Sequence, residues 1–374
     1  MADFDVVVIG AGIAGASAAY ELAATRRVLV VERESQPGYH ATGRSAAVFA
    51  ESYGNPIIRA ITAASRAFYE APPSGFADAP LWRPRGALII GRADQRPALE
   101  RLHAEVSALV AGARLVDAAE ALRLVPILKP DYVAGGMLDP AAMELDVNAI
   151  HQGYLRGLRR RGGAVVLDAE VLGIERSGGL WRVTTRAGAF AAPVVVNATG
   201  AWADAVAEMA GARPLGLRPL RRTAVVFDPP FGVAVDGWPM VIDADEEFYF
   251  KPDAGRLLAS PADETPSAPC DAQPDEIDVA TALARFEEAT GVEVRRIGHK
   301  WAGLRTFMPD RSPAVGFDPA VEGFFWLAGQ GGYGIQTAPA LARIAAALLR
   351  GEALPPDVAA LGVTAADLAP RRAM

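Results

Sequence analysis

The stretch Asp5-Val-Val-Val-Ile-Gly-Ala-Gly-Ile-Ala-Gly-Ala-Ser17 decides the fold of this chain. An apolar strand runs directly into glycines at positions 10, 12 and 15, and a helix of small residues follows. In a unit of this kind the first glycine permits a tight turn, the second lets the backbone approach a pyrophosphate, and the third lets the helix pack closely on the strand. The phosphates would lie against free N–H groups at the positive end of the helix.

A second apolar strand points to the same kind of site. It covers residues 27–31 and ends at Glu32, which is placed to accept hydrogen bonds from an adenosine ribose. The βαβ unit over residues 5–33 therefore predicts a dinucleotide site, although it does not say which dinucleotide binds there.

Composition limits the class of protein. The chain has 374 residues, and an apolar content of 51% is enough for two domains with separate cores. A net charge of −7 argues against nucleic acid as a main partner. A single cysteine, Cys270, excludes an internal disulfide and fits a reducing compartment. The longest apolar tract is too short to span a bilayer, and Asp3 and Asp5 stand where a signal peptide would need positive charge, so we expect a cytoplasmic protein.

Hydrophobic periodicity predicts the remaining elements. We expect helices over 56–70, 94–111, 117–124, 146–161, 274–289 and 337–350. We expect strands over 86–90, 164–167, 171–175, 181–185, 193–197, 221–229, 239–243, 247–251, 293–300 and 323–328. The strand at 193–197 ends in a second small-residue loop, Asn197-Ala-Thr-Gly-Ala201, which suggests that the chain returns there to the nucleotide-binding sheet.

These elements predict an α/β fold with two domains. A Rossmann domain would be discontinuous, over residues 1–85, 145–220 and 297–374. A mixed-sheet α+β domain would be inserted as residues 86–144 and 221–296. Three glycine-rich loops after apolar strands, near residues 10, 200 and 330, favour a long, permanently held flavin over an exchanging nicotinamide, without deciding the matter.

Six motifs lie in order along nearly the whole chain: Val7-Val-Ile-Gly-Ala-Gly-Ile-Ala-Gly15, Glu32, His40-Ala-Thr-Gly-Arg-Ser-Ala-Ala47, Val196-Asn-Ala-Thr-Gly-Ala-Trp202, Trp301-Ala-Gly-Leu-Arg305 and Gly329-Gln-Gly-Gly-Tyr-Gly-Ile-Gln336. Together they resemble the FAD-dependent D-amino-acid oxidase/dehydrogenase family, and most of all its bacterial D-arginine dehydrogenases. The resemblance implies a non-covalent FAD, a glutathione-reductase-like FAD-binding Rossmann domain and a substrate domain over the flavin ring. The residues implied to bind FAD are Gly10, Gly12, Ile13, Ala14, Gly15, Glu32, Arg33, Gly43, Arg44, Ser45, Ala46, Val171, Ala198, Gly200, Trp202, Gly303, Gly331, Gly332, Tyr333, Gly334, Ile335 and Gln336.

The resemblance also implies the chemistry: hydride transfer from the Cα of a D-amino acid to flavin N5, giving an imino acid and then a 2-oxo acid and ammonia. Such a reaction needs a carboxylate clamp, and the planar fork of arginine suits it because it makes two parallel hydrogen bonds. Arg222 and Arg305 match the family's clamp, and Tyr53 and Tyr249 match tyrosines that approach the substrate carboxylate or close the pocket. We assign no general base. The histidines share no spacing that suggests a metal, so we expect none.

The substrate pocket is expected to be less polar than in the arginine-oxidising members. Those members carry an acidic side chain where this chain has Ala87 and a polar histidine where it has Val48. Without these partners a cationic side chain would lose its hydration uncompensated, so we expect apolar or aromatic D-amino acids rather than D-Arg or D-Lys. Glu51 could still supply a charge near this pocket. The residues expected to line it are Ala46, Val48, Ala87, Ile242, Gly332 and Gln336.

The same residues are compatible with other functions. A flavin enzyme that oxidises 2-hydroxy acids or secondary amines would share the fold and the clamp. A non-catalytic FAD-binding subunit is a different class, and the two arginines argue against it because a pure binder needs no carboxylate clamp. The electron acceptor, quinone or oxygen, does not follow from any motif.

Overall fold

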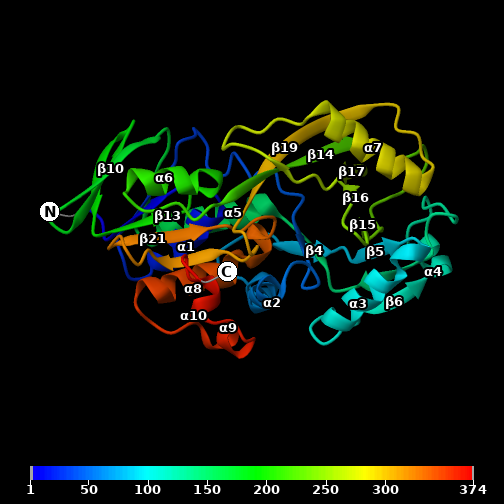
Figure 1. Ribbon diagram of the computed structural model, residues 1–374, viewed down its shortest axis with the longest axis horizontal. Coiled ribbons are helices and arrows are strands. Elements are labelled where there is room, and N and C mark those ends of the chain that lie inside the picture. Colours follow the sequence, from blue (N-terminus) through cyan, green and yellow to red (C-terminus); the bar gives the residue numbers. More distant parts are fainter. Residues whose placement is uncertain (1–2, 373–374) are drawn as a thin grey trace.

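The glycine-loop unit lies in the middle of a mostly parallel sheet in the computed structural model, which describes residues 3–372 (Figure 1). Strand β1 (Val6–Ile9) pairs in parallel with β2 (Val28–Val31) on one side and with β13 (Val194–Asn197) on the other. The chain thus returns to the sheet at β13, as predicted. The sheet has six strands, completed by β9 (Ala164–Val166), β20 (Ala314–Phe317) and β21 (Phe324–Ala328), in the order β20-β21-β13-β1-β2-β9.

The turn after β1 requires glycine. Gly10 has φ of +100°, and a Cβ there would lie 2.6 Å from the carbonyl oxygen of Ala198. A Cβ on Gly15 would lie 1.9 Å from the carbonyl oxygen of Gly10. Any side chain at either position would therefore push the loop away from the strand ends.

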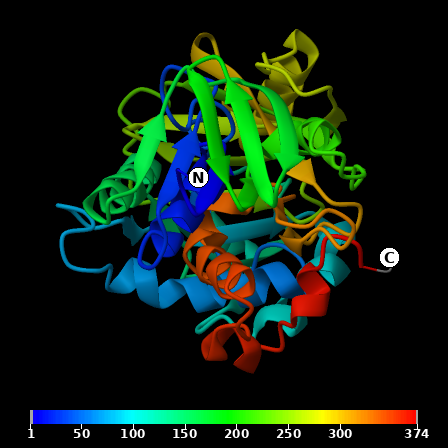
Figure 2. The same cartoon turned by 90° about the vertical axis from the view of Figure 1, so that its left-hand side faces the viewer.

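Alternating side chains of the sheet form two cores. On one face, Val6, Val8, Val28 and Val30 pack with α1 (Ile13–Leu22) and α8 (Gly334–Leu349), which α2 (Pro56–Glu70) and α5 (Val147–Arg160) adjoin. Figure 2 shows α8 and α2 beneath the sheet. The other face packs against α6 (Ala203–Met209) and an antiparallel sheet of β10 (Val171–Ser177), β11 (Leu180–Thr185) and β12 (Gly188–Ala192).

A nine-stranded mixed sheet forms the second lobe, on the right of Figure 1. Its longest strands, β14 (Arg218–Phe227) and β19 (Ile297–Phe307), are antiparallel, with Arg222 opposite Gly303 and Leu220 opposite Arg305. Helix α7 (Glu276–Thr290) covers it, with Phe286 against Phe227 and Phe250. The remaining strands are β5 (Ala87–Gly91), β6 (Arg114–Asp117), β7 (Gly135–Asp139), β15 (Met240–Asp243), β16 (Tyr249–Asp253), β17 (Arg256–Ser260) and β18 (Thr265–Pro266).

A small sheet joins the two lobes. It consists of β3 (Val48–Phe49), β8 (Met143–Leu145) and β4 (Trp82–Pro84), in the order β3-β8-β4. The short helices are η1 (Ala93–Gln95), α3 (Arg96–Val106), α4 (Ala118–Leu124), η2 (Gly200–Trp202), α9 (Pro356–Ala360) and α10 (Ala365–Leu368).

The predicted α/β fold class is confirmed. The helix predicted over 94–111 is wrong in extent, since α3 ends at Val106 and turns follow to Gly112. Strands β6, β7, β8, β12 and β17 are among those that the periodicity missed. Residues 297–307, which the predicted limits assign to the Rossmann domain, pair with β14 in the nine-stranded sheet; the domain limits themselves stay a prediction. No helix of the described chain is long and apolar enough to cross a membrane.

Candidate active site

A long cavity follows the carboxyl ends of the parallel strands. Of the predicted FAD-binding residues, it is lined by Gly10, Gly12, Ile13, Ala14, Glu32, Arg33, Arg44, Ser45, Ala46, Val171, Ala198, Gly200, Trp202, Gly303, Gly331, Gly332, Gly334 and Ile335. Gly15 and Gly43 do not line it, and Tyr333 and Gln336 line a neighbouring cavity instead. The first cavity therefore runs from the glycine loop to the end of β19 and to the start of α8.

Side chains from distant segments hold the glycine loop. Glu32 Oε2 accepts a hydrogen bond from the Ala11 N–H at 2.7 Å, and Thr42 Oγ1 accepts one from the Ile13 N–H at 2.9 Å. His151 Nε2 lies 2.8 Å from the Ala11 carbonyl oxygen. Glu32 therefore organises the loop as well as facing the cavity. Thr42 lies in the motif 40–47 and His151 in a predicted helix, but their contacts with the loop were not predicted, because each lies far from it along the chain.

The lining suits a bound dinucleotide. Gln330 lines this cavity, and its Nε2 is buried with no hydrogen-bond partner in residues 3–372. Such a donor is costly to bury unless a ligand accepts from it. At the other end, Arg33 lies over the Trp202 ring at 4.9 Å, and His40 lies 4.8 Å from it. The residues present fit FAD, with Glu32 and the glycine loop at the adenosine and phosphate end and Gln330 near the start of α8.

A second cavity of about 720 Å³ opens from the first. The two share the lining residues Ser45, Ala46, Arg222, Tyr249, Arg305, Gly332 and Ile335. All ten residues predicted for catalysis and the substrate pocket line this second cavity: Ala46, Val48, Tyr53, Ala87, Arg222, Ile242, Tyr249, Arg305, Gly332 and Gln336. The structure thus brings together residues that are almost 300 positions apart in the sequence.

The two arginines at the junction differ in their partners. Arg222 Nε donates to the Asp263 carbonyl oxygen at 2.9 Å, and its Nη2 lies 3.3 Å from Glu264 Oε1. Arg305 Nη1 donates to the Tyr53 hydroxyl at 3.3 Å, and Arg305 forms no ion pair within the described chain. Burial, and then the like charge of Arg305, lower the pKa of Arg222. The pair therefore presents cationic charge that Glu264 balances only in part.

The side chains of Gln336 and Tyr333 contact neighbouring residues beside this junction. Gln336 Oε1 accepts from the Ala50 N–H at 3.3 Å, and its Nε2 donates to Thr62 Oγ1 at 2.9 Å. The Tyr333 ring packs edge-on against Tyr53, and burial raises the pKa of Tyr333 to about 12. Both side chains hold the wall of the cavity in place.

The wall of this second cavity has an apolar part and a charged part. Val48, Ala87, Ile89, Met240 and Ile242 form the apolar part. The sequence did not predict the charged residues of the lining, which are Arg59, Arg101, Glu105, Asp243, Asp245, Glu246, Glu264 and Arg311. Their partners lie on other elements, so no local motif reveals them.

Most of these charges are paired. Arg59 binds Glu105 at 3.1 Å, Arg311 binds Glu264 at 2.7 Å, and Arg92 lies 3.4 Å from Asp243. The neutral Gln95 also donates to both Asp243 and Asp245. Glu51, which could have charged the pocket, forms a two-fold hydrogen bond with Arg66 at 2.8 and 2.7 Å and lines neither cavity.

A Rossmann fold whose dinucleotide cavity opens into a pocket with two arginines at the junction is typical of one class, the oxidoreductases that act on small organic molecules. The comparisons with known proteins narrow it. The model of the family described as DAO, FAD dependent oxidoreductase, matches residues 5–348, so the chain belongs to that family. It is an FAD-dependent oxidoreductase, and FAD is its cofactor.

Similar proteins extend along nearly the whole chain. Uncharacterized oxidoreductase YurR of Bacillus subtilis is 26% identical over 369 residues, covering 92% of this chain and 95% of that protein. A glycine oxidase of Bacillus licheniformis is 25% identical, covering 93% of each chain. The crystal structure of L-proline dehydrogenase from P. horikoshii has a TM-score of 0.83 at 23% identity, covering 95% of this chain and 96% of that one.

Proposed function

We propose that the protein oxidises D-amino acids with apolar or aromatic side chains to imino acids, which hydrolyse to 2-oxo acids and ammonia. The observation that carries this proposal is the pair of arginines where the two cavities meet. Arg305 has no ion-pair partner in residues 3–372, and Arg222 shares Glu264 with Arg311. A substrate carboxylate would supply the missing anion, held by planar forks that make parallel hydrogen bonds.

Bound FAD would be the two-electron acceptor in this reaction, so that the hydrogen on Cα can leave as hydride. The nitrogen lone pair of the substrate then forms the C=N bond, and one N–H proton passes to solvent. The protein would hold the carboxylate with Arg222 and Arg305, while Tyr53 accepts a hydrogen bond from Arg305 and orients it. Tyr333, with its pKa of about 12, stays protonated at neutral pH and cannot act as a base. The substrate amine must be neutral before the hydride leaves, because its lone pair forms the C=N bond.

The preference for uncharged side chains rests on the wall beyond the clamp. Val48, Ala87 and Ile242 offer no group that could pair with a guanidinium or an ammonium. Of the carboxylates that line the same cavity, those of Glu105, Asp243 and Glu264 already have arginine partners. Asp245 and Glu246 are exposed to solvent. Asp139 lies opposite Ala87 on β7, but Ser52 and the Ala141 N–H donate to its carboxylate, and it does not line the cavity. Preference for the D enantiomer follows from the sequence resemblance alone.

The deciding experiment mixes the FAD-loaded protein with substrates without oxygen and follows the bleaching of the flavin near 450 nm. The panel contains D- and L-Phe, Leu, Met, Arg and Lys, with glycine, sarcosine, L-proline and lactate. We expect the fastest reduction with D-Phe, D-Leu or D-Met. A higher efficiency for D-Arg would contradict the apolar pocket, and reduction by the L enantiomers would contradict the chirality.

A second candidate is the oxidation of a secondary amine or of glycine. It is supported by the glycine oxidase relative, and the fold is shared with an L-proline dehydrogenase. The clamp would serve these substrates equally well. Fastest reduction by sarcosine, L-proline or glycine in the same panel would establish this candidate in place of the first.

A further inference from the structure

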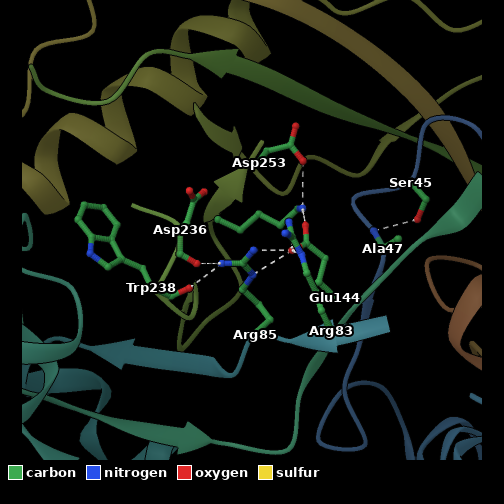
Figure 3. Close-up of polar contacts among 9 residues, drawn as sticks. Ser45, Ala47, Arg83, Arg85, Glu144, Asp236, Trp238 and Asp253 are labelled. Carbon is green, nitrogen blue, oxygen red and sulfur yellow. Dashed lines mark hydrogen bonds and ion pairs between the residues drawn. The ribbon is translucent and has the colours of Figure 1, made fainter. Parts of the chain in front are cut away.

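A buried ion cluster lies beside the substrate cavity without lining it. Its centre is Glu144 on β8, and Figure 3 shows Arg83, Arg85 and Asp253 around it. Glu144 Oε2 accepts from Arg85 Nη2 at 2.5 Å and from Arg83 Nε at 2.9 Å, and Oε1 accepts from Lys251 Nζ at 2.7 Å. One carboxylate therefore joins three cations.

The cluster depends on this one carboxylate. The side chains of Arg85 and Lys251 are each only 3% exposed, whereas Arg83 is 62% exposed. Asp253, which also bonds Lys251, is 39% exposed. Arg85 adds hydrogen bonds to the carbonyl oxygens of Asp236 and Trp238, but these neutral acceptors do not balance its charge. Without Glu144, two buried cations would lose their main counterion, which is strongly unfavourable.

Each partner of Glu144 lies close in sequence or register to a residue of the substrate cavity. Lys251 follows Tyr249 by two positions on β16, so both side chains leave the same face of the sheet. Arg85 precedes Ala87, the first residue of β5, by two positions. Glu144 itself lies opposite Val48 in the β3–β8 pair.

The strand that carries Glu144 also holds the loop at the cavity junction. The Leu145 N–H donates to the Ala47 carbonyl oxygen at 3.0 Å. Ala47 has φ of 39°, an unusual value for a residue with a side chain, and its N–H donates to Ser45 Oγ at 3.2 Å. Figure 3 shows Ser45 and Ala47 beside the cluster. The loop with Ser45 and Ala46, which line both cavities, thus depends on the same strand.

We propose that Glu144 is a positioning residue for the substrate cavity: it ties together the strands that carry Val48, Ala87 and Tyr249 and thereby sets the width of the cavity around the substrate side chain. The inference rests on the proposed function for its kinetic consequence, but its structural part can be tested without any substrate. Glu144 acts through these strands and touches neither substrate nor FAD.

The structural test is hydrogen–deuterium exchange on FAD-loaded Glu144→Gln. We expect faster exchange in peptides that cover residues 46–50, 87–91 and 249–253. The matched control is Asp318→Asn, because Asp318 is also a buried carboxylate, bound by Trp326 and Arg371, but lines neither cavity. The control should leave those three peptides unchanged. Unchanged exchange in Glu144→Gln would overturn the proposal, whatever the enzyme oxidises.

The kinetic test compares a large and a small substrate, D-Phe and D-Ala. In Glu144→Gln the ratio of kcat/KM for D-Phe over D-Ala should change at least tenfold, mainly through KM, while Asp318→Asn keeps the wild-type ratio. A ratio that stays within twofold of wild type would overturn the kinetic part. A wild-type flavin that neither substrate reduces would instead contradict the proposed function, and the exchange result would still decide the role of Glu144.

A second variant, which removes only one partner of Glu144, tests the proposal if Glu144→Gln does not fold. Lys251→Met leaves Glu144 paired with Arg85 and removes only the tie to β16. Exchange should then rise at 249–253 and stay at the wild-type level at 46–50 and 87–91. A uniform rise over all three peptides, or none at 249–253, would contradict the proposed tie.

Discussion

Two like charges in contact with one cavity need a third group to hold them there. Arg222 is oriented by the Asp263 carbonyl oxygen, whereas Arg305 depends on Tyr53 and on the space beside Gly332. A Cβ on Gly332 would lie 2.8 Å from Arg305 Nη1 and 3.1 Å from its Cδ. Glycine at residue 332 therefore leaves the space that the Arg305 fork occupies.

Gly332→Ala should weaken the clamp. The added methyl would displace Arg305 and remove about one charge-assisted hydrogen bond, worth roughly 1.5–3 kcal/mol, or about a 10- to 100-fold loss in kcat/KM. Steady-state kinetics measures this loss in kcat/KM. Gly173→Ala is the control, because a Cβ at residue 173 would have no atom within 4 Å. Wild-type efficiency in Gly332→Ala would show that Arg305 does not bind the substrate carboxylate.

Ala87 is the residue at which the pocket should change its charge preference. A carboxylate introduced by Ala87→Glu would face the cavity and could pair with the cationic side chain of D-Arg, at some cost in stability because Ala87 is buried. We expect efficiency for D-Arg relative to D-Leu to rise at least tenfold over wild type. Ala87→Gln, which has the size without the charge, should leave that ratio unchanged. If Ala87→Glu gains no efficiency with D-Arg, the assignment of Ala87 to the substrate pocket is wrong.

At the scale of elements, the sequence predicts a helix or strand best where the segment itself contains the residues that begin and end it. The strand β1 with its glycines, and α2 with Asn55 capping the Ile58 N–H, carry their own start and stop signals. Strand β17 follows β16 after only a two-residue turn, so the periodicity shows no separate element. Within the site, Arg222 and Arg305 were predicted from the family resemblance. Gln330 lies inside the motif 329–336 but stands out only through the burial of its side chain, and the Arg59–Glu105 pair joins segments that local patterns do not connect.

His151 on α5 links an element to the cofactor loop and makes that link sensitive to pH. Burial lowers the pKa of His151, while its contact with the Ala11 carbonyl opposes the shift. The folded protein therefore binds the proton less readily than the unfolded chain does. The stability that neutral His151 contributes to the folded state is fully present above the unfolded pKa of about 6.5. It is lost as the pH falls below that value, because the unfolded chain then takes up the proton first.

His151→Gln should reduce this pH dependence, because an amide can still donate to Ala11 but does not titrate. We expect the unfolding midpoint of wild type to fall more between pH 7.5 and 5.5 than that of His151→Gln, measured by thermal denaturation with FAD bound. His103→Gln is the matched control, since His103 also contacts a backbone carbonyl, that of Ala113, but is only half-buried. Equal slopes in wild type and His151→Gln would contradict the role given to His151.

Over the whole molecule, each lobe has its own core, and the FAD cavity is lined by residues of both lobes. Its lining combines the glycine loop of the six-stranded sheet with Gly303, Leu304 and Arg305 from β19 of the nine-stranded sheet. Arg44 spans the same boundary, donating to the carbonyl oxygens of Ala272 and Ala302 at 2.9 Å. A cofactor held by both sheets acts as a further link between the lobes, so its loss should affect more than the Rossmann sheet.

Removal of FAD should therefore destabilise the protein as a unit. A ligand at 100 times its Kd stabilises the folded state by about 2.7 kcal/mol, provided that it does not bind the unfolded chain. We expect the apoprotein to unfold at a lower temperature than the FAD-loaded protein and to exchange amide hydrogens faster in β19 as well as in the glycine loop. AMP, which can occupy only the adenosine end, should restore protection near Glu32 but not in β19. If FAD protects only the six-stranded sheet and leaves β19 unchanged, the cofactor does not link the two lobes, and the junction of the cavities must form without it.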